Sequence, residues 1–358
     1  MALATVVLLC DCARSQSERG FQPDPSPAPT AAESAIPPMV APAAPSIAEE
    51  AWRDYRDPGV EFFCQPPGPD YWTIDYRCRA FCSSYTTYEF GTPPETNPGW
   101  APLSRLNFSL NSCWHGLQIA HETPTWAFQL EWLMAGQYIQ GDFEDYDWRN
   151  PNNDFTDLGF ARERWTEGQM LDLGFKRQLF DRPLGLPVEV WPMIGFRWQR
   201  LDVVAYDAEQ VKFKNQWLDP PLTVSGDVID FNQQYYIGYA GAQLRGRLET
   251  KMLPPLIWTL QGDWGWTEAY DIDHHLLREG DMYTMNRTHG DCWHAAVSVE
   301  ALVTNRFSFG VQADHLQINT TGSHHWLNDP LQIDETWNNG VSVSSQQNWI
   351  TAFLRVRI

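Results

Sequence analysis

The chain has 358 residues, a formal net charge of −20 at pH 7, and 18 tryptophans, 13 tyrosines and 18 phenylalanines. An acidic balance of this size disfavours nucleic acid and anionic lipid surfaces as main partners and is compatible with cationic substrates. The tryptophan content favours strands and membrane–water interfaces. After the N-terminal segment, no run approaches the roughly 18 uninterrupted apolar residues of a transmembrane helix, so a membrane-spanning form requires a closed β-barrel.

The N-terminal region predicts export followed by a linker. Residues 1–14 resemble part of a signal, with a short apolar run and then small and polar residues, although a basic start is missing. Cys10 after "VLL" also suggests a lipoprotein cleavage site, and a plain secretory signal is the simpler interpretation. Residues 15–50 are rich in Pro, Ala and Ser and are predicted to be a disordered linker. Residues 51–79, without a clear period, are interpreted as an N-terminal extension.

Seven cysteines are scattered without a CxxC pair or zinc-like spacing. In an exported protein some of Cys64, Cys78, Cys82 and Cys113 are candidates for disulfides, and spacing does not decide the connectivity. For Cys292 a buried structural thiol is an equally good interpretation.

A period of two over residues 126–139 is the first strong strand signal. Its even positions are apolar and its odd positions are mostly small or polar, which is the pattern of a membrane-spanning β-strand. The even positions hold Trp126, Phe128, Leu130, Trp132 and Met134, and the apolar exceptions at odd positions are Leu133 and Ile139.

Residues 256–267 and 293–303 repeat this alternation, with Trp, Leu and Val on one face and Thr, Gln, Asp, His and Glu on the other. Weaker versions occur at 80–92, 103–119, 167–180, 187–204, 232–249, 305–318 and 346–358. Together they make about ten strands, and an even number closes an outer-membrane barrel. Short turns alternate with long polar segments near 92–102, 141–165, 205–231, 270–291 and 319–345, as expected when long loops share one rim.

We therefore predict an all-β fold, a ten-stranded antiparallel transmembrane β-barrel over residues 80–358 with long extracellular loops. A soluble β-sandwich also alternates, but its strands are usually about 5–6 residues long. Several runs here alternate over ten or more residues with Trp on the apolar face, which favours the barrel.

Carried forward, the alternation gathers titratable side chains at one rim. In the strand that begins at residue 256 the inward face is odd-numbered, so Asp271, Asp273 and His275 are predicted to point inward. Asp145 and Asp147 extend the odd, inward face of the strand that begins at residue 126. A carboxylate beside an imidazole supplies the positioned base that peptide hydrolysis needs. A β-bulge in either strand would break this register.

The stretches "FEDYDW" and "YDIDHH" resemble the two active-site motifs of the omptin family, outer-membrane proteases with ten-stranded barrels. That family carries an Asp-x-Asp-Trp run after its third strand and an Asp-x-Asp-x-His run after its seventh. Here the two motifs follow the third and seventh predicted strands. The likeness also includes "SRLNFS", "MIGFRWQR" and "YYIGY" and covers roughly residues 80–358.

The resemblance implies an aspartic-type outer-membrane endopeptidase whose active site faces the cell exterior. Carried over residue by residue, Asp273 and His275 would be the dyad that activates a water molecule, and Asp145 and Asp147 would be the pair that helps to hold it. No metal or other cofactor is implied, apart from lipopolysaccharide as an activating lipid. The protein would act as a monomer.

The resemblance also implies cationic peptide or protein substrates. The specificity pocket of the family is acidic and takes a basic side chain before the scissile bond. Asp271 matches one acidic position directly, and Glu89 in "SSYTTYEF" is the candidate for the other. An acidic pair would select Arg or Lys through charge-assisted hydrogen bonds.

The expected lipid site departs from the family. Omptins bind lipopolysaccharide on the outer barrel wall through basic and polar groups, and Arg200 in "FRWQR" matches one of them. Phe196, Trp198 and Phe231 stand where Tyr, Glu and Arg are expected. These substitutions predict that this protein either does not depend on lipopolysaccharide or binds it in a different way from the family.

Other interpretations remain open from the residues alone. A porin, adhesin or receptor uses the same scaffold without catalysis, and a lipid-directed enzyme would want a serine that is not placed with the His–Asp cluster. A metal site formed by Asp271, Asp273, His274 and His275 is disfavoured because adjacent strand residues point to opposite faces. The His pair in "GSHH", residues 322–325, is interpreted as a solvated loop tip.

Overall fold

The computed structural model describes residues 70–91, 102–136, 140–148, 155–181, 188–249, 254–277 and 282–358, and these ranges consist of strands and their connections. The predicted signal, the linker, Cys10 and Cys64 lie outside them. No helix in the described part of the chain has the length and apolar character to cross a bilayer. No disulfide joins any two of Cys78, Cys82, Cys113 and Cys292.

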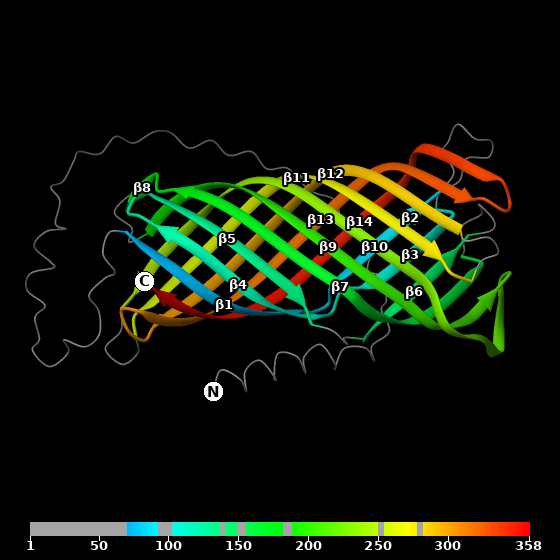
Figure 1. The fold of residues 1–358 in the computed structure, drawn as a ribbon, viewed down its shortest axis with the longest axis horizontal. Coiled ribbons are helices and arrows are strands. Elements are labelled where there is room, and N and C mark those ends of the chain that lie inside the picture. Colours follow the sequence, from blue (N-terminus) through cyan, green and yellow to red (C-terminus); the bar gives the residue numbers. More distant parts are fainter. Residues whose placement is uncertain are drawn as a thin grey trace, which may run out of the picture.

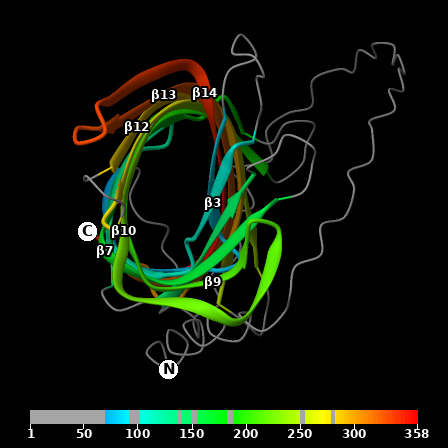
Figure 2. The same ribbon diagram turned by 90° about the vertical axis from the view of Figure 1, so that its right-hand side faces the viewer.

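The strands form one sheet that closes on itself, as Figures 1 and 2 show. In chain order they are β1 (Tyr71–Phe81), β2 (Tyr85–Phe90), β3 (Ser104–Ser109), β4 (Cys113–Glu122), β5 (Trp126–Ala135), β6 (Gln140–Asp147), β7 (Asp157–Arg177), β8 (Phe180–Asp181), β9 (Val188–Phe213), β10 (Gln216–Leu248), β11 (Leu256–His275), β12 (Met282–Leu302), β13 (Phe307–Asn328) and β14 (Ile333–Arg357).

Ten long strands make the ring, which confirms the predicted ten-stranded barrel. β1 and β2, β3 and β4, and β5 and β6 are halves of three of them, and β8 is a short segment beside β9. All neighbours pair antiparallel. The pairing of β1 and β2 with β14 closes the ring, so no strand of it is left with an unpaired edge.

The barrel begins earlier than predicted. We expected residues 51–79 to precede it, but β1 starts at Tyr71 and pairs with both β14 and β4. Its outward positions are apolar and its inward positions, from Thr73 to Arg79, are polar or charged. The alternation was therefore present in the sequence, and charged inward residues concealed it.

The outer surface carries an apolar belt that the sequence alternation predicted. Its exposed members include Trp72, Ile74, Tyr76, Leu117, Ile119, Trp126, Trp132, Met134, Leu173, Phe175, Ile194, Phe196, Leu244, Leu260, Trp264, Trp266, Trp293, Val297, Val299, Phe307, Phe309, Val311 and Leu354. On β11 the belt ends at Trp266, after which the outward side chains include Glu268 and Tyr270. The last residues of the long strands therefore lie beyond the membrane-spanning region. We call this end of the barrel the mouth.

The segments predicted to be long loops are largely strand. β9 and β10 extend their hairpin to Phe213 and Gln216, and β13 and β14 extend theirs to Asn328 and Ile333. The strands stay paired beyond the apolar belt because the two strands of each hairpin satisfy each other's backbone N–H and C=O groups. These two extended hairpins contribute sheet to the mouth (Figure 1).

Side chains bridge the lumen at two heights. Near the mouth, the hydroxyls of Thr86 on β2 and Tyr235 on β10 are 3.1 Å apart. At mid-height, Gln199 on β9 and Gln347 on β14 exchange two amide hydrogen bonds of 3.1 and 3.0 Å. Each of these pairs joins strands on opposite sides of the ring. The lumen is therefore crossed by side chains at both heights.

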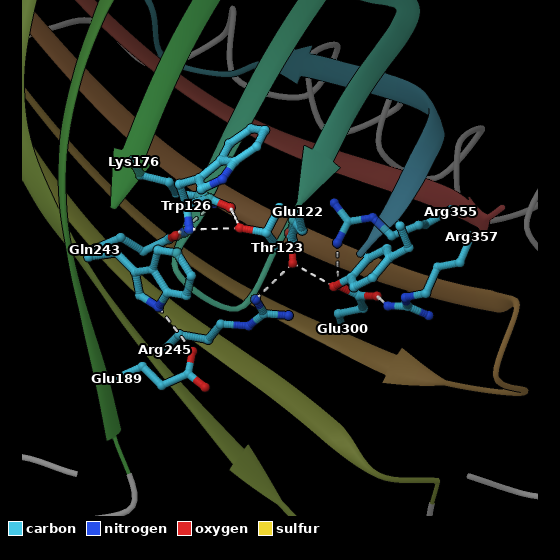
Figure 3. Close-up of polar contacts among 12 residues, drawn as sticks. Glu122, Thr123, Trp126, Lys176, Glu189, Gln243, Arg245, Glu300, Arg355 and Arg357 are labelled. Atoms are coloured by element: carbon cyan, nitrogen blue, oxygen red, sulfur yellow. Dashed lines mark hydrogen bonds and ion pairs between the residues drawn. The ribbon is translucent and has the colours of Figure 1, made fainter. Parts of the chain in front are cut away.

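A network of charged side chains crosses the far end of the lumen (Figure 3). Arg245 on β10 reaches Glu122 on β4 at 3.0 Å, and Arg355 and Arg357 on β14 both bind Glu300 on β12. Between this network and the mid-height bridge lies a polar cavity of about 110 Å³, room for several water molecules.

Gly195 on β9 lets an aromatic ring pack against the sheet. A Cβ atom there would collide with the ring and hydroxyl of Tyr239, whose hydroxyl donates to Asp172 at 2.8 Å. We expect Gly195→Val to lower the free energy of unfolding by about 1–3 kcal/mol, the usual cost of overpacking. Gly238→Val is the matched control, because a Cβ atom there meets nothing within 4 Å. Urea titrations in detergent micelles measure both, and equal stability of the two variants would contradict this packing.

Candidate active site

The register of β11 carries the predicted titratable residues into the mouth. From Asp263 to His275 the odd positions are inward and mostly buried, while Trp264, Trp266 and Ile272 are exposed. β11 pairs with β10 and with β12 without a register shift over this length. Because no bulge intervenes, Asp271, Asp273 and His275 share one face, as the alternation predicted.

Asp273 and His275 form a buried pair at the end of β11. The Nε2 atom of His275 lies 3.0 Å from the Oδ2 atom of Asp273. The Asp273 residue is 0 % exposed and His275 is 7 % exposed. A carboxylate that holds one ring nitrogen leaves the other nitrogen of the imidazole to exchange a proton with a bound molecule.

Asp145 and Asp147 lie on β6, which belongs to the opposite wall of the mouth. They share the inward face of buried Phe143, because positions two residues apart on a strand point the same way. Both aspartates are half-buried. β6 and β11 are separated by three strands on the shorter path around the ring, so the two acidic pairs face each other across the mouth.

Stacked aromatic rings join the two walls beneath these carboxylates. Phe143 lies against Phe108 at a centroid distance of 4.9 Å, and Phe108 stacks on Phe231 at 4.1 Å and 10°. Phe231 on β10 is the cross-strand partner of Asp273. The three buried rings form a continuous apolar contact between the two walls and thereby help to fix the spacing of the walls.

Asp271 is a deeply buried carboxylate without a cationic partner. It is 1 % exposed, and no Arg, Lys or His of the described ranges forms an ion pair with it. Burial raises the pKa of Asp271 to about 7; the neighbouring Gln233 amide partly opposes this shift and the Asp273 carboxylate adds to it. A buried carboxyl that lacks a counter-ion is suited to a cationic ligand.

Glu89 does not lie beside Asp271, so that prediction is wrong. On β2 the inward residues are Thr86, Tyr88 and Phe90, and Glu89 points to the outer surface. There it binds Arg105 at 2.6 Å. The prediction rested on a short stretch whose register was one residue out, and a one-residue error moves a side chain to the other face of a strand.

His324 was missed, because the "GSHH" stretch was interpreted as a solvated loop tip. It lies on the inward face of β13 and is 0 % exposed. Its ring is stacked between Phe90 at 4.7 Å and Trp337 at 5.3 Å. A count of inward parity along 307–324 would have found it, since all even positions of this strand share one face.

Arg200 lies on the outer wall, as predicted for a lipid-binding residue. Its guanidinium is 2.7 Å from Asp202 and 3.3 Å from Glu167, so two carboxylates already neutralise it. Phe196 and Trp198 share this outward face. Phe231 was predicted to lie here too, but it is buried between the walls of the mouth, so its place in a lipid site is wrong.

The two histidines of "DHH" point apart. His274 is outward and stacks on Tyr283 at 4.0 Å and 14°, away from Asp271 and Asp273. Within the described ranges, no three His, Cys, Asp or Glu side chains converge in an arrangement able to hold a metal ion.

Fold and site together define a closed, ten-stranded barrel of the outer-membrane type with an acidic, histidine-containing mouth. The omptin family pattern matches residues 101–357. The chain belongs to the omptin family, which places it among outer-membrane proteases of bacteria. No curated protein sequence matches it.

The barrel fold is also found in a solved structure. The outer membrane protease OmpT from Escherichia coli superposes with a TM-score of 0.68 at 18 % identity, covering 81 % of this chain and 98 % of that one. The translocator domain of the autotransporter NalP from Neisseria meningitidis gives a TM-score of 0.31 at 6 % identity, covering 78 % and 88 %. The first match shows the same barrel fold, and the second carries no further argument.

Proposed function

We propose that this protein is an outer-membrane endopeptidase that hydrolyses peptide bonds beside basic residues, with its site facing the cell exterior. The observation that carries the proposal is the buried Asp273–His275 pair, with Nε2 and Oδ2 3.0 Å apart, facing Asp145 and Asp147 across the mouth. Membership of the omptin family supports the same reaction class.

In the proposed reaction a water molecule attacks the peptide carbonyl carbon. Asp145 and Asp147 hold this water from one wall, and His275 takes its proton on Nδ1 while Asp273 stabilises the imidazolium through Nε2–H. The carbon–nitrogen bond then breaks, and His275 returns the proton to the leaving amine. The products are a carboxylic acid and an amine, which together carry the atoms of the peptide and of one water molecule, and a final proton transfer between them gives the carboxylate and ammonium forms. General base help of this kind is typically worth 10²–10⁴-fold in rate.

Asp271 is proposed to select the basic side chain. It lies two residues from Asp273 on the same face, which puts a lone carboxylate about 7 Å along the strand from the dyad. An Arg or Lys side chain would supply the counter-ion that Asp271 lacks. Because Glu89 faces outward, the site has one such buried acid rather than the expected acidic pair.

Lipopolysaccharide is proposed as an activating lipid that binds the outer wall at Arg200. A lipid phosphate there competes with Asp202 and Glu167 for the guanidinium. This competition predicts weaker binding than at an unpaired arginine, and added salt should reduce it further.

The side-chain bridges across the lumen argue against the alternative of an open channel. Thr86–Tyr235 and Gln199–Gln347 span the barrel, and charged pairs cross the far end. A diffusion pore leaves its lumen polar and water-filled over the full length. An adhesin or receptor on this barrel stays compatible with the fold, and cleavage experiments separate it from a protease.

The test is cleavage of internally quenched peptides by protein refolded in detergent, with and without lipopolysaccharide. Each peptide carries one Arg, or one citrulline, the uncharged analogue of Arg, at the same place, and mass spectrometry locates the cut. We expect cleavage beside Arg at a kcat/KM at least 10-fold above that for citrulline, the effect of one charge-assisted hydrogen bond. Inactivity on every peptide and lipid would overturn the proposal and favour a binding role.

A further inference from the structure

Three buried side chains that no step of the proposed reaction uses, Tyr88, His324 and Asn286, are joined by hydrogen bonds beside the Asp271 carboxylate. Asn286 on β12 lies directly between two cross-strand partners, Asp271 on β11 and His324 on β13. Tyr88 reaches the same point from β2. Asp271, Asn286, His324 and Tyr88 are all at least 96 % buried.

The amide oxygen of Asn286 is held by two donors. Nδ1 of His324 lies 2.8 Å from Asn286 Oδ1, and the Tyr88 hydroxyl lies 3.3 Å from the same oxygen. The Tyr88 hydroxyl is also 2.9 Å from His324 Nδ1. An amide oxygen has two lone pairs and satisfies both donors at once.

The proton of His324 belongs on Nδ1. Burial lowers the pKa of His324 to about 4, against the opposing effect of the Asp273 carboxylate, so the ring is neutral at working pH and carries one proton. Nε2 has no hydrogen-bond partner in the described part of the chain. A proton there would be a buried, unpaired donor, whereas on Nδ1 it meets Asn286.

With its oxygen held, Asn286 must present its Nδ2 group to Asp271. Nδ2 of Asn286 and both carboxyl oxygens of Asp271 are buried, and among the described residues none has a hydrogen-bond partner of good geometry. Directly opposed residues of neighbouring strands have Cβ atoms about 4.5–5.5 Å apart, within reach of such a bond. The opposite amide orientation would set oxygen against carboxylate and is repulsive once Asp271 is ionised.

We propose that Tyr88, His324 and Asn286 are positioning residues that orient Asp271, so that its carboxylate discriminates a cationic substrate side chain from a neutral one. This inference rests on the proposed function of Asp271. His324 and Tyr88 fix Asn286, Asn286 donates to one oxygen of the Asp271 carboxylate, and the other oxygen is left for the substrate. Because Glu89 does not lie beside Asp271, this support takes the place of the second carboxylate expected in the specificity pocket.

Asn286→Leu tests the network, since leucine keeps the shape and removes the donor. We expect the ratio of kcat/KM for the Arg peptide to that for the citrulline peptide to fall about 10-fold or more. His324→Phe keeps an aromatic ring between Phe90 and Trp337 and removes Nδ1–H, and should shift the ratio in the same direction. The kcat/KM for the citrulline peptide should stay within about 3-fold, which reports an intact dyad.

An Asp271→Asn background distinguishes positioning from general damage. If Asn286 acts through the Asp271 charge, adding Asn286→Leu to Asp271→Asn should leave the Arg-to-citrulline ratio unchanged. An unchanged ratio in the single Asn286→Leu variant overturns the inference. Parallel loss of activity on both peptides also overturns it, because that outcome indicates a structural role alone.

A binding measurement that involves no cleavage can test the positioning role of Asn286 separately from the proposed protease activity. Isothermal titration with arginine amide and citrulline amide reads the same site in wild type and Asn286→Leu. The wild type could cleave no peptide but still bind arginine amide more tightly than citrulline amide, with this preference lost in Asn286→Leu. That result would overturn the proposed protease activity and support this inference. A wild type that cleaves beside Arg, with both preferences intact in Asn286→Leu, would sink only the inference.

Discussion

His275→Ala is expected to reduce kcat/KM for the Arg peptide by about 10²–10⁴-fold, the usual contribution of a positioned general base. In the proposed reaction His275 is the group that moves the proton, and Asp273 alone cannot replace it because its carboxylate lies behind the imidazole, 3.0 Å from Nε2. The loss should lie mostly in kcat, because the Asp271 carboxylate that binds the basic side chain is untouched.

The adjacent histidine offers a matched control. His274→Ala removes the same kind of side chain from the same strand, but His274 points outward and stacks on Tyr283. We expect His274→Ala to keep kcat/KM within about 3-fold of wild type. Equal losses in the two variants would mean that the end of β11 matters for folding rather than for proton transfer, and the proposed role of His275 would be wrong.

Asp271→Asn should reduce kcat/KM for the Arg peptide by about 10²-fold and leave the citrulline peptide nearly unchanged. The buried carboxylate has no cation from the described protein, so the substrate supplies it, and losing one partner of a buried, hydrogen-bonded charge pair costs about 2–5 kcal/mol. Glu89→Gln is the control from the position first matched to this pocket. It removes a charge that binds Arg105 outside the barrel, and we expect no change in preference.

The raised pKa of the Asp271 carboxyl group predicts that the preference for the Arg peptide over the citrulline peptide depends on pH. Because the pKa of Asp271 is raised to about 7, the free enzyme is protonated and uncharged there below that pH. The Arg-to-citrulline ratio should therefore be constant above pH 8 and fall as the pH drops through 7, approaching 10-fold per unit. Using the ratio cancels the titration of the dyad itself. A ratio independent of pH between 5 and 8 would contradict a lone, buried Asp271.

Alternation along each strand predicted most of this protein. A period of two needs only local sequence, because neighbouring side chains point to opposite faces of any strand. It was enough to expect a ten-stranded barrel and to orient Asp145, Asp147, Asp271, Asp273 and His275 inward. It failed where register depended on one short stretch, at Glu89, and where charged inward residues hid the pattern, at Tyr71–Arg79.

The barrel and the set of acids and histidine at its mouth could be predicted from the sequence, because both follow from parity within single strands. Which of these groups meet could not be predicted in this way. The stack of Phe108 on Phe231, the bridges across the lumen and the contacts of Asn286 with Tyr88 and His324 join segments more than 35 residues apart. Such contacts depend on strand order and stagger around the ring, which the closure of the whole sheet sets and no local pattern records.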